Sequence, residues 1–269
     1  MSGRPRVMGI VNVTPDSFSD GGRLGSVAAA VAHGLRLVDR GADLLDIGGE
    51  STRPGADPVS EAEEIGRVIP VIAALRAAWD GPISVDTMKP AVARAAVAAG
   101  ATMWNDVTAL TFSPDAPAVA AELGCDMVLM HMQGAPRTMQ ADPRYDDVVA
   151  EVRDALLARA AAAMAAGVAR DRIWLDPGIG FGKTAAHNLT LTARLDTLVA
   201  TGFPVLYGAS RKRLIQAVDP TATDAADRLG GSLALAVEAA RRGVTIVRVH
   251  DVRETVQALA MQAALAAAP

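Results

Sequence analysis

Short apolar runs alternate along the chain with longer segments in which apolar residues recur at helical spacing. Eight such pairs follow one another, and no charged or low-complexity linker separates them. The runs that predict strands are Val7–Val11, Leu44–Ile47, Ile83–Val85, Thr102–Trp104, Met127–Met130, Ile173–Leu175, Val205–Tyr207 and Thr245–Val249. The segments that predict helices are Val27–Arg40, Glu61–Trp79, Ala91–Ala99, Ala116–Leu123, Val148–Ala166, Leu189–Ala200, Ala226–Arg242 and Arg253–Ala267.

Apolar runs joined by helical crossovers are typical of a parallel sheet that helices cover. Eight strand–helix units in 269 residues favour a sheet that closes on itself. We therefore predict one α/β domain over residues 1–269 with the (β/α)8 TIM-barrel fold. A doubly wound open sheet is the structural alternative, but its first strand-to-helix turn carries a glycine fingerprint that residues 11–25 lack.

Each apolar run is followed by side chains that can form hydrogen bonds or carry charge. One such residue is usually a cap or a turn former. In a barrel, however, the carboxyl ends of all the strands share one face, where barrel enzymes place their sites. A purely structural ring of paired charges is the alternative, although buried charges contribute little to stability. The residues of this expected ring are Asn12, Asp46, Asp86, Asn105, Asp106, His131, Asp176, Ser210, Lys212, Arg248 and His250.

The segment from Leu175 to Lys183 contains the clearest of these signals. The apolar run ends at Asp176, and Pro177 and a glycine-spaced turn follow at once. A carboxylate at the end of a buried strand needs donors, which either the protein or a ligand with paired N–H groups supplies. The alternative is a tight turn in which the aspartate caps its own backbone.

Composition limits the classes of partner. The net charge of −4 and the absence of a basic stripe argue against a nucleic-acid partner. The single cysteine, Cys125, cannot form an internal disulfide, and the first residues do not resemble a signal peptide. The alanine-rich tracts are too short to span a bilayer. We therefore expect a cytoplasmic protein without a membrane partner.

Seven motifs, in order along the chain, resemble those of the dihydropteroate synthase family. The resemblance implies the (β/α)8 fold, a homodimer, Mg²⁺, and the substrates 6-hydroxymethyl-7,8-dihydropterin pyrophosphate and p-aminobenzoate. The products would be 7,8-dihydropteroate and pyrophosphate. The motifs are residues 8–21 (MGIVNVTPDSFSDG), 46–55 (DIGGESTRPG), 84–87 (SVDT), 105–107 (NDV), 175–183 (LDPGIGFGK), 208–212 (GASRK) and 248–252 (RVHDV).

The resemblance implies that four residues hold the pterin ring: Asp86, Asn105, Asp176 and Lys212. Two neighbouring N–H donors lie on the guanidine-like edge of the ring, and one carboxylate can accept both, which suits Asp176. The opposite edge mixes donors and acceptors, as do the other three side chains. Asp46 either extends this wall of acids or binds loop backbone.

Two further groups follow from the same resemblance. Arg248 and His250 would bind the departing pyrophosphate, and Asn12 would supply one oxygen to Mg²⁺, which prefers oxygen ligands and keeps several waters. Zinc at His250 is disfavoured because the other histidines lack metal-like spacing. The p-aminobenzoate site, where sulfonamides would compete, is expected at Thr52, Arg53, Pro54, Phe181, Ser210 and the stem of Lys212.

The motifs contain no serine–histidine or cysteine–histidine pair, so a covalent enzyme intermediate is not expected. We expect the C–O bond to pyrophosphate to break first and the arylamine to attack afterwards. Among enzymes, the rival is a methyltetrahydrofolate-dependent corrinoid methyltransferase, which has no use for a pyrophosphate clamp. Outside catalysis, the rival is an idle pterin-binding paralogue.

Overall fold

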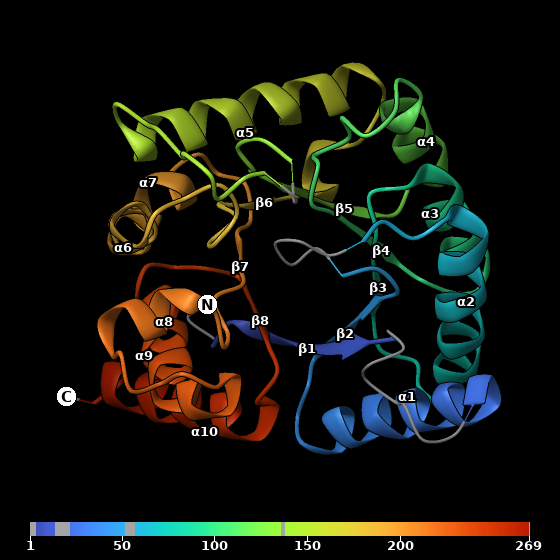
Figure 1. The fold of residues 1–269 in the computed structure, drawn as a ribbon, viewed down its shortest axis with the longest axis horizontal. Coiled ribbons are helices and arrows are strands. Elements are labelled where there is room, and N and C mark those ends of the chain that lie inside the picture. The colour runs from blue at the N-terminus through green and yellow to red at the C-terminus, as the bar shows by residue number, and fades with distance from the viewer. Residues whose placement is uncertain (1–3, 14–21, 52–56, 136–137, 269) are drawn as a thin grey trace.

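Eight parallel strands lie around a common axis, with helices outside them, in the computed structural model (Figure 1). It describes residues 4–13, 22–51, 57–135 and 138–268, of which residues 22–26 by their backbone alone. The strands are β1 (Arg6–Asn12), β2 (Leu44–Gly48), β3 (Ile83–Asp86), β4 (Met103–Asp106), β5 (Asp126–Met130), β6 (Ile173–Asp176), β7 (Leu206–Tyr207) and β8 (Ile246–Val249). The α-helices are α1 (Gly22–Asp39), α2 (Glu61–Ala78), α3 (Pro90–Ala98), α4 (Ala116–Leu123), α5 (Val148–Ala165), α6 (Ala185–Ala193), α7 (Leu195–Val199), α8 (Arg213–Val218), α9 (Leu229–Arg241) and α10 (Val252–Ala266).

The sheet closes into a barrel, which confirms the predicted fold class. The strands pair in the order β6-β5-β4-β3-β2-β1-β8-β7, and every ladder is parallel. The remaining join, between β6 and β7, consists of a single bridge from Leu175 to Val205. The Leu175 N–H also donates to Pro204 O at 2.9 Å there. All eight predicted strands are present.

Period-two alternation along the strands builds the interior of the barrel in layers. The lower layer is apolar and consists of Met8, Leu44, Met103, Val128, Leu206 and Ile246, with Trp174 packed against them. Two residues further along their strands, Leu44 gives way to Asp46, Met103 to Asn105, Trp174 to Asp176 and Ile246 to Arg248. The same periodicity that fills the barrel therefore places polar side chains directly above the apolar plug.

The helices pack their apolar faces on the outside of the strands and form the larger core cluster. Their starts follow ordinary capping chemistry. Ser60 caps α2 by accepting from Glu63 N, and Asp147 caps α5 by accepting from Val149 N and Ala150 N. None of the helices in the described part of the chain is long and apolar enough to cross a bilayer.

Three helical details differ from the prediction. The segment predicted as one helix over 189–200 forms α6 and α7, because Arg194 between them has φ −121° and ψ 26° and interrupts the helical backbone. The segment predicted over 226–242 begins as a 3-10 turn, Ala225–Arg228, and becomes α-helical only from Leu229. Helix α8 was not predicted, since six residues are too few to give a clear periodic signal.

Two glycines with left-handed backbone differ in the space around them. Gly178, after Asp176, has φ +67°, and a Cβ placed on it would lie 1.9 Å from the carbonyl oxygen of His131. Gly124, at the C-terminus of α4, has φ +57°, but a Cβ there would meet nothing within 4 Å. Of these two glycines, Gly178 is the one required both by its backbone angle and by the close approach of another chain segment.

We expect Gly178→Ala to destabilise the fold far more than Gly124→Ala. The control substitution carries only the left-handed strain of roughly 1–2 kcal/mol. At Gly178 the added methyl must also push back the segment at His131. Urea unfolding of both variants measures the difference, and equal losses of unfolding free energy would contradict the steric explanation.

Candidate active site

Arg248 lies at the centre of a buried polar network in the barrel mouth. Its Nε donates to Asp46 Oδ2 at 2.5 Å, and its Nη2 donates to Asp86 Oδ2 at 2.7 Å. Asn105 Nδ2 also donates to Asp46 Oδ2, at 3.2 Å. Asp46 is fully buried, and the Arg248 side chain is 20% exposed. One guanidinium thus links strand β8 to β2 and β3, and through Asp46 to β4.

Asp46 takes neither of its two predicted roles in full. It extends the row of acids, and among the described residues its bonded partners are the side chains of Arg248 and Asn105 and not loop backbone. Its second oxygen, Oδ1, is buried and has no hydrogen-bond partner among the described residues. Asp46 therefore orients two neighbours that face the cavity of the barrel.

The charges of this network perturb one another. Burial raises the pKa of the Asp86 carboxyl to about 7, against the opposing effect of Arg248. Burial alone would lower the pKa of Arg248, but the Asp46 and Asp86 carboxylates outweigh it and hold the pKa above its ordinary value. Arg248 is therefore a permanent cation, whereas Asp86 can exchange a proton near neutral pH.

Asp176 and Lys212 face each other across the join between β6 and β7. Asp176 Oδ1 accepts from Gly178 N at 2.7 Å, so the predicted turn cap is present. Burial raises the pKa of Asp176, and Lys212 opposes that rise most strongly. Burial lowers the pKa of Lys212 to about 8, against the effect of Asp176. Asp176 therefore serves both as a cap and as an acid beside a lysine.

The ammonium of Lys212 also touches the loop after β6. It donates to Ile179 O and lies 4.6 Å from the centre of the Phe181 ring. A cation over an aromatic face is favourable where water is partly excluded. The Phe181 ring and the Lys212 ammonium thus form one wall of the mouth, apolar at the ring and positively charged at the ammonium, next to Asp176.

Ser210 and His250, two more predicted residues, form a serine–histidine pair, contrary to the expectation that the motifs contain none. Ser210 Oγ and His250 Nδ1 are 3.0 Å apart, and His250 N donates to Ser210 Oγ at 3.2 Å. The next residue, Arg211, has φ +58° and points away from this pair to Asp251, which accepts from its Nε at 2.9 Å. The ion pair of Arg211 with Asp251 thus joins the two residues that directly follow Ser210 and His250.

Asn12 lies at the end of β1 beside the acids. A Cβ built on Gly48 would be 3.8 Å from Asn12 Oδ1 and 3.7 Å from Asp86 Oδ2. The amide oxygen of Asn12 and the Asp86 carboxylate thus both lie against Gly48, and oxygen ligands of these kinds suit Mg²⁺. Thr52, Arg53 and Pro54, predicted for the second substrate, lie outside the described residues.

Two members of the expected ring stabilise loops. Asp106 is fully buried, and its carboxylate accepts from Thr108 N, Thr108 Oγ1 and Leu110 N, each at 2.7 Å. These bonds hold a turn in which Ala109 and Leu110 have positive φ. Burial lowers the pKa of His131 to about 3, so its imidazole is neutral. The oxygens of Asp106 are thus occupied by this turn, and His131 Nδ1 lies 2.9 Å from Lys183 Nζ.

Lys183 is a residue of the mouth that the sequence did not assign. Its buried Nζ lies 2.9 Å from His131 Nδ1 and donates to the carbonyls of His131, Gly178 and Phe181 at 3.0–3.1 Å. It therefore ties the loop after β6 to the end of β5. One signal could have identified it: the chain has only three lysines, Lys89, Lys183 and Lys212, among 26 basic residues.

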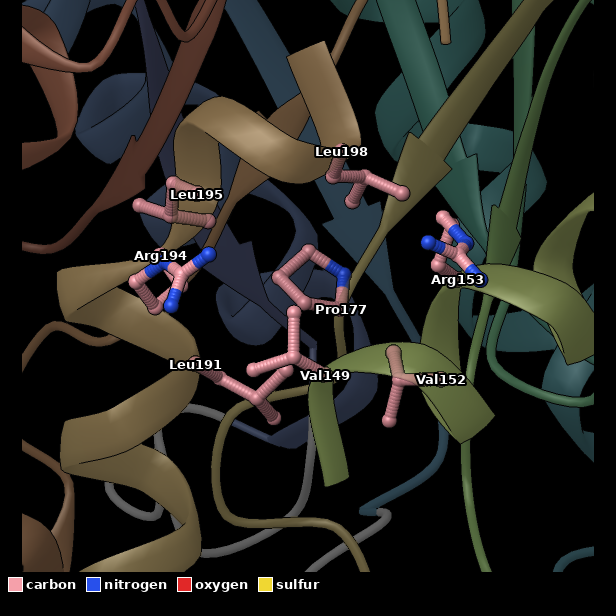
Figure 2. A pocket seen from close by; sticks show the side chains of 8 residues that line it. All are labelled: Val149, Val152, Arg153, Pro177, Leu191, Arg194, Leu195 and Leu198. Carbon is pink, nitrogen blue, oxygen red and sulfur yellow. The ribbon is translucent and has the colours of Figure 1, made fainter. Parts of the chain in front are cut away.

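Figure 2 shows a crevice between α5 and the α6–α7 pair, lined mainly by aliphatic side chains. Pro177 connects it to the mouth, and Arg153 and Arg194 lie at its edges. Its lining contains neither a carboxylate nor a nucleophile. The chemistry therefore belongs to the barrel mouth and not to this crevice.

Comparisons with known proteins agree with this geometry. A family described as pterin binding enzyme matches residues 8–250. The dihydropteroate synthase of Escherichia coli K12 is 50% identical over 258 residues, which are 95% of this chain and 89% of that protein. Xanthomonas albilineans dihydropteroate synthase, solved with 4-aminobenzoic acid, superposes with a TM-score of 0.93 at 55% identity and covers 99% of this chain and 94% of its own. The enzyme of the same organism in complex with 7,8-dihydropteroate gives a TM-score of 0.90 at 52% identity, over 100% and 96% of the two chains.

We expect Lys183→Met to lower the unfolding free energy by at least about 2 kcal/mol, because several buried acceptors lose their donor together. Arg170→Met is the matched control, since exposed Arg170 also donates to two carbonyls, those of Thr201 and Gly202. We expect the control to cost less than about 1 kcal/mol, as is usual for surface substitutions. Urea unfolding compares the two, and a similar cost for both would contradict the assigned role of Lys183.

Proposed function

Because the chain belongs to the dihydropteroate synthase family of pterin-binding enzymes, we infer that it is a transferase of folate biosynthesis. It condenses 6-hydroxymethyl-7,8-dihydropterin pyrophosphate with p-aminobenzoate, giving 7,8-dihydropteroate and pyrophosphate. The observation that carries this conclusion is the network in one barrel mouth: Arg248 donates to Asp86 and Asp46, and Asn105 donates to Asp46.

We assign the pterin ring to Asp86, Asn105, Asp176 and Lys212. Carboxylates accept the N–H groups of the ring, while the Asn105 amide and the Lys212 ammonium donate to its acceptors. The support is that Asp86 and Asn105 are paired across adjacent strands, and that Asp176 and Lys212 are close enough for each charge to affect the pKa of the other. Arg248 holds Asp86 in place and favours its charged form, because its Nη2 donates to that carboxylate.

We assign p-aminobenzoate to Thr52, Arg53, Pro54, Phe181, Ser210 and the stem of Lys212. Phe181 offers an aromatic face under the Lys212 ammonium, and Ser210 lies on the neighbouring loop. Sulfonamides, which mimic this substrate, would compete for the same contacts.

The departing pyrophosphate is assigned to Arg248 and His250. Nε and one N–H of Nη2 of Arg248 bind the two acids, so Nη1 and the second N–H of Nη2 are the donors that we assign to the diphosphate. Mg²⁺ fits beside them because the Asn12 amide supplies the hard oxygen ligand that this ion prefers, and diphosphate oxygens complete the set. When bound, the ion would neutralise negative charge on the leaving group.

The reaction then needs no covalent enzyme intermediate. The bond between the pterin methylene carbon and the diphosphate oxygen breaks, and its electron pair leaves on that oxygen, which Arg248 and His250 stabilise. The arylamine nitrogen forms the new C–N bond and releases one proton. Cys125, the one thiol, is buried between α4 and β5 at the amino-terminal end of the strand, away from this chemistry.

We further propose a cytoplasmic homodimer. A reducing compartment suits the single buried thiol, for which burial raises the pKa to about 11. Exposed apolar side chains on α6 and α8, Leu189 and Val218, offer a surface for self-association, and the two helices are in contact.

One assay tests the activity and separates the rivals. The pure protein is mixed with the dihydropterin pyrophosphate, p-aminobenzoate and Mg²⁺, and pyrophosphate is measured. Release that requires all three components supports the synthase. An idle paralogue would bind the pterin in calorimetry without releasing pyrophosphate, and a corrinoid methyltransferase would bind methyltetrahydrofolate instead.

We expect Asp176→Asn to lower kcat/KM for the pterin substrate by about 100-fold or more, because a charged acceptor of two N–H groups is lost. Asp126→Asn is the control, since Asp126 begins β5 at the opposite end of the barrel. Steady-state pyrophosphate release measures both. Full turnover by Asp176→Asn would exclude Asp176 as the pterin anchor.

Affinity for the ring should depend on pH through Asp86. Its pKa of about 7 means that the carboxylate form, which accepts N–H groups, is lost as pH falls below 7. Binding should therefore weaken by up to about tenfold per pH unit in that range and level off above it. Calorimetry with 6-hydroxymethylpterin, which has no titrating diphosphate, measures the profile. Asp86→Asn should flatten it, and an unchanged slope in that variant would refute the assignment.

A further inference from the structure

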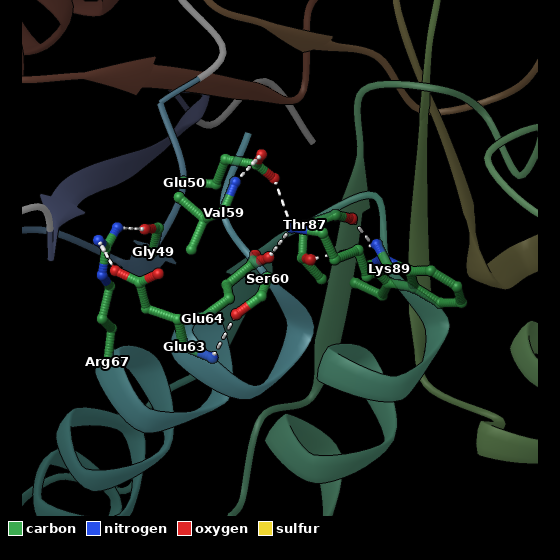
Figure 3. Close-up of polar contacts among 10 residues, drawn as sticks. Gly49, Glu50, Val59, Ser60, Glu63, Glu64, Arg67, Thr87 and Lys89 are labelled. Atoms are coloured by element: carbon green, nitrogen blue, oxygen red, sulfur yellow. Dashed lines mark hydrogen bonds and ion pairs between the residues drawn. The ribbon is translucent and has the colours of Figure 1, made fainter. Parts of the chain in front are cut away.

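A second buried charge cluster lies beside the mouth, and the reaction described above does not use it (Figure 3). Lys89 Nζ donates to Glu50 Oε2 at 2.7 Å and to Glu64 Oε2 at 2.6 Å. The three side chains are 7%, 8% and 0% exposed, respectively. They come from three separate elements: the start of α3, the segment after β2 and the first turn of α2.

The cluster joins the two ends of the segment that carries Thr52, Arg53 and Pro54. Glu50 precedes that segment, and its second oxygen, Oε1, accepts from the backbone N–H of Val59, which follows it, at 3.0 Å. One carboxylate therefore bridges both stems, residues 48–51 and 57–60, and Lys89 holds that carboxylate.

Helix α2 fixes the first stem from the other side. Arg67 Nη1 donates to the carbonyl of Gly49 at 2.7 Å. A Cβ on Gly49 would lie 2.7 Å from Val68 Cγ1 and 3.0 Å from Glu64 Cγ, so the stem packs directly on the helix. Figure 3 shows Arg67, Glu63 and Glu64 converging on this stem from α2.

The cluster is also tied to the site through rigid backbone. Lys89 follows Asp86 by three residues, and the intervening Thr87 carbonyl accepts from the buried Trp104 Nε1 at 2.7 Å. Gly48, two residues before Glu50, lies against Asp86. A displacement of Lys89 or Glu50 would therefore move the stems. Asp86 would stay in place, because Arg248 donates a hydrogen bond to it.

Stability alone does not explain these charges. Buried ion pairs are often no better than apolar side chains of similar volume. Burial opposes the Lys89 charge, yet its hydrogen bonds to both glutamates keep its pKa above the ordinary value. Glu64 Oε1 is buried without a hydrogen-bond partner in the described part of the chain, a cost that a purely structural core would avoid.

We propose that Lys89 is a positioning residue for the second substrate: through Glu50 and Glu64 it fixes both stems of segment 52–56 against α2 and so sets the affinity for p-aminobenzoate. This rests on the proposed function, because Thr52, Arg53 and Pro54 enter it as contacts of that substrate. Two of the pterin contacts, Asp86 and, through Asp46, Asn105, are held separately by Arg248, so we expect the effect to be selective.

Steady-state kinetics of Lys89→Met tests the selectivity. We expect KM for p-aminobenzoate to rise at least tenfold, with KM for the pterin pyrophosphate within twofold of the original. Arg94→Met is the matched control, since Arg94 lies on the same helix and loses only an exposed pair with Glu122. Its two KM values should not change. A KM for p-aminobenzoate within twofold in Lys89→Met, or an equal rise for both substrates, would overturn the proposal.

A double variant separates positioning from folding. Lys89→Met/Glu64→Met removes the more deeply buried of the two acids that Lys89→Met leaves unpaired, and should recover part of the thermal stability that Lys89→Met loses. Glu50 stays without its cation, so KM for p-aminobenzoate should remain high. Recovery of KM together with Tm would show a structural role only and would overturn the proposal.

Hydrogen exchange at the Val59 amide gives a readout without catalysis. Loss of the Lys89 anchor should speed exchange of that amide at least tenfold, and Arg94→Met should leave it unchanged. Unchanged exchange in Lys89→Met would overturn the positioning claim. If the original protein released no pyrophosphate from the complete mixture, the proposed function would fail, and this exchange measurement would still decide whether Lys89 holds the stems.

Discussion

The ion pairs of Arg248 with Asp46 and Asp86 are the constraint on which the barrel mouth depends. A guanidinium inside a barrel is tolerated only if acids meet it in good geometry. Asp46 and Asp86 do so from adjacent strands, at 2.5 Å and 2.7 Å. Because strand register fixes where each side chain points, a slip of one residue would turn an acid outward. The network therefore requires both the closed barrel and its register.

Much of the fold could be predicted from the sequence because it depends on local patterns. Apolar runs of strand length and helical crossovers predicted all eight strands, and the polar residues predicted at the strand ends lie together at one mouth of the barrel. The exact helix boundaries were less accessible. Arg194 interrupts a segment of continuous helical spacing. Helix propensity and spacing alone do not predict where such an interruption falls.

The parts of the site that were missed depend on contacts between distant loops. Lys183 bonds to His131, 52 residues earlier, and Lys89 bonds to Glu50, 39 residues earlier. No periodicity relates such positions. Asp106, a member of the expected polar ring, has a different role, since its oxygens hold the following turn. The sequence identifies which residues are able to do chemistry. The hydrogen bonds of the folded structure decide which of them stabilise the fold instead.

The single bridge between Leu175 and Val205 has a consequence for the occupied enzyme. Every other neighbouring pair of strands is joined by a full ladder, so the barrel has one weak seam. Asp176 lies on one side of it and Lys212 on the other. A pterin ring bound by both residues would connect the two sides of this seam through its own hydrogen bonds, where the backbone forms only one bridge. Bound substrate would therefore reinforce the weakly paired side of the barrel, and the occupied protein would have a higher free energy of unfolding than the empty one.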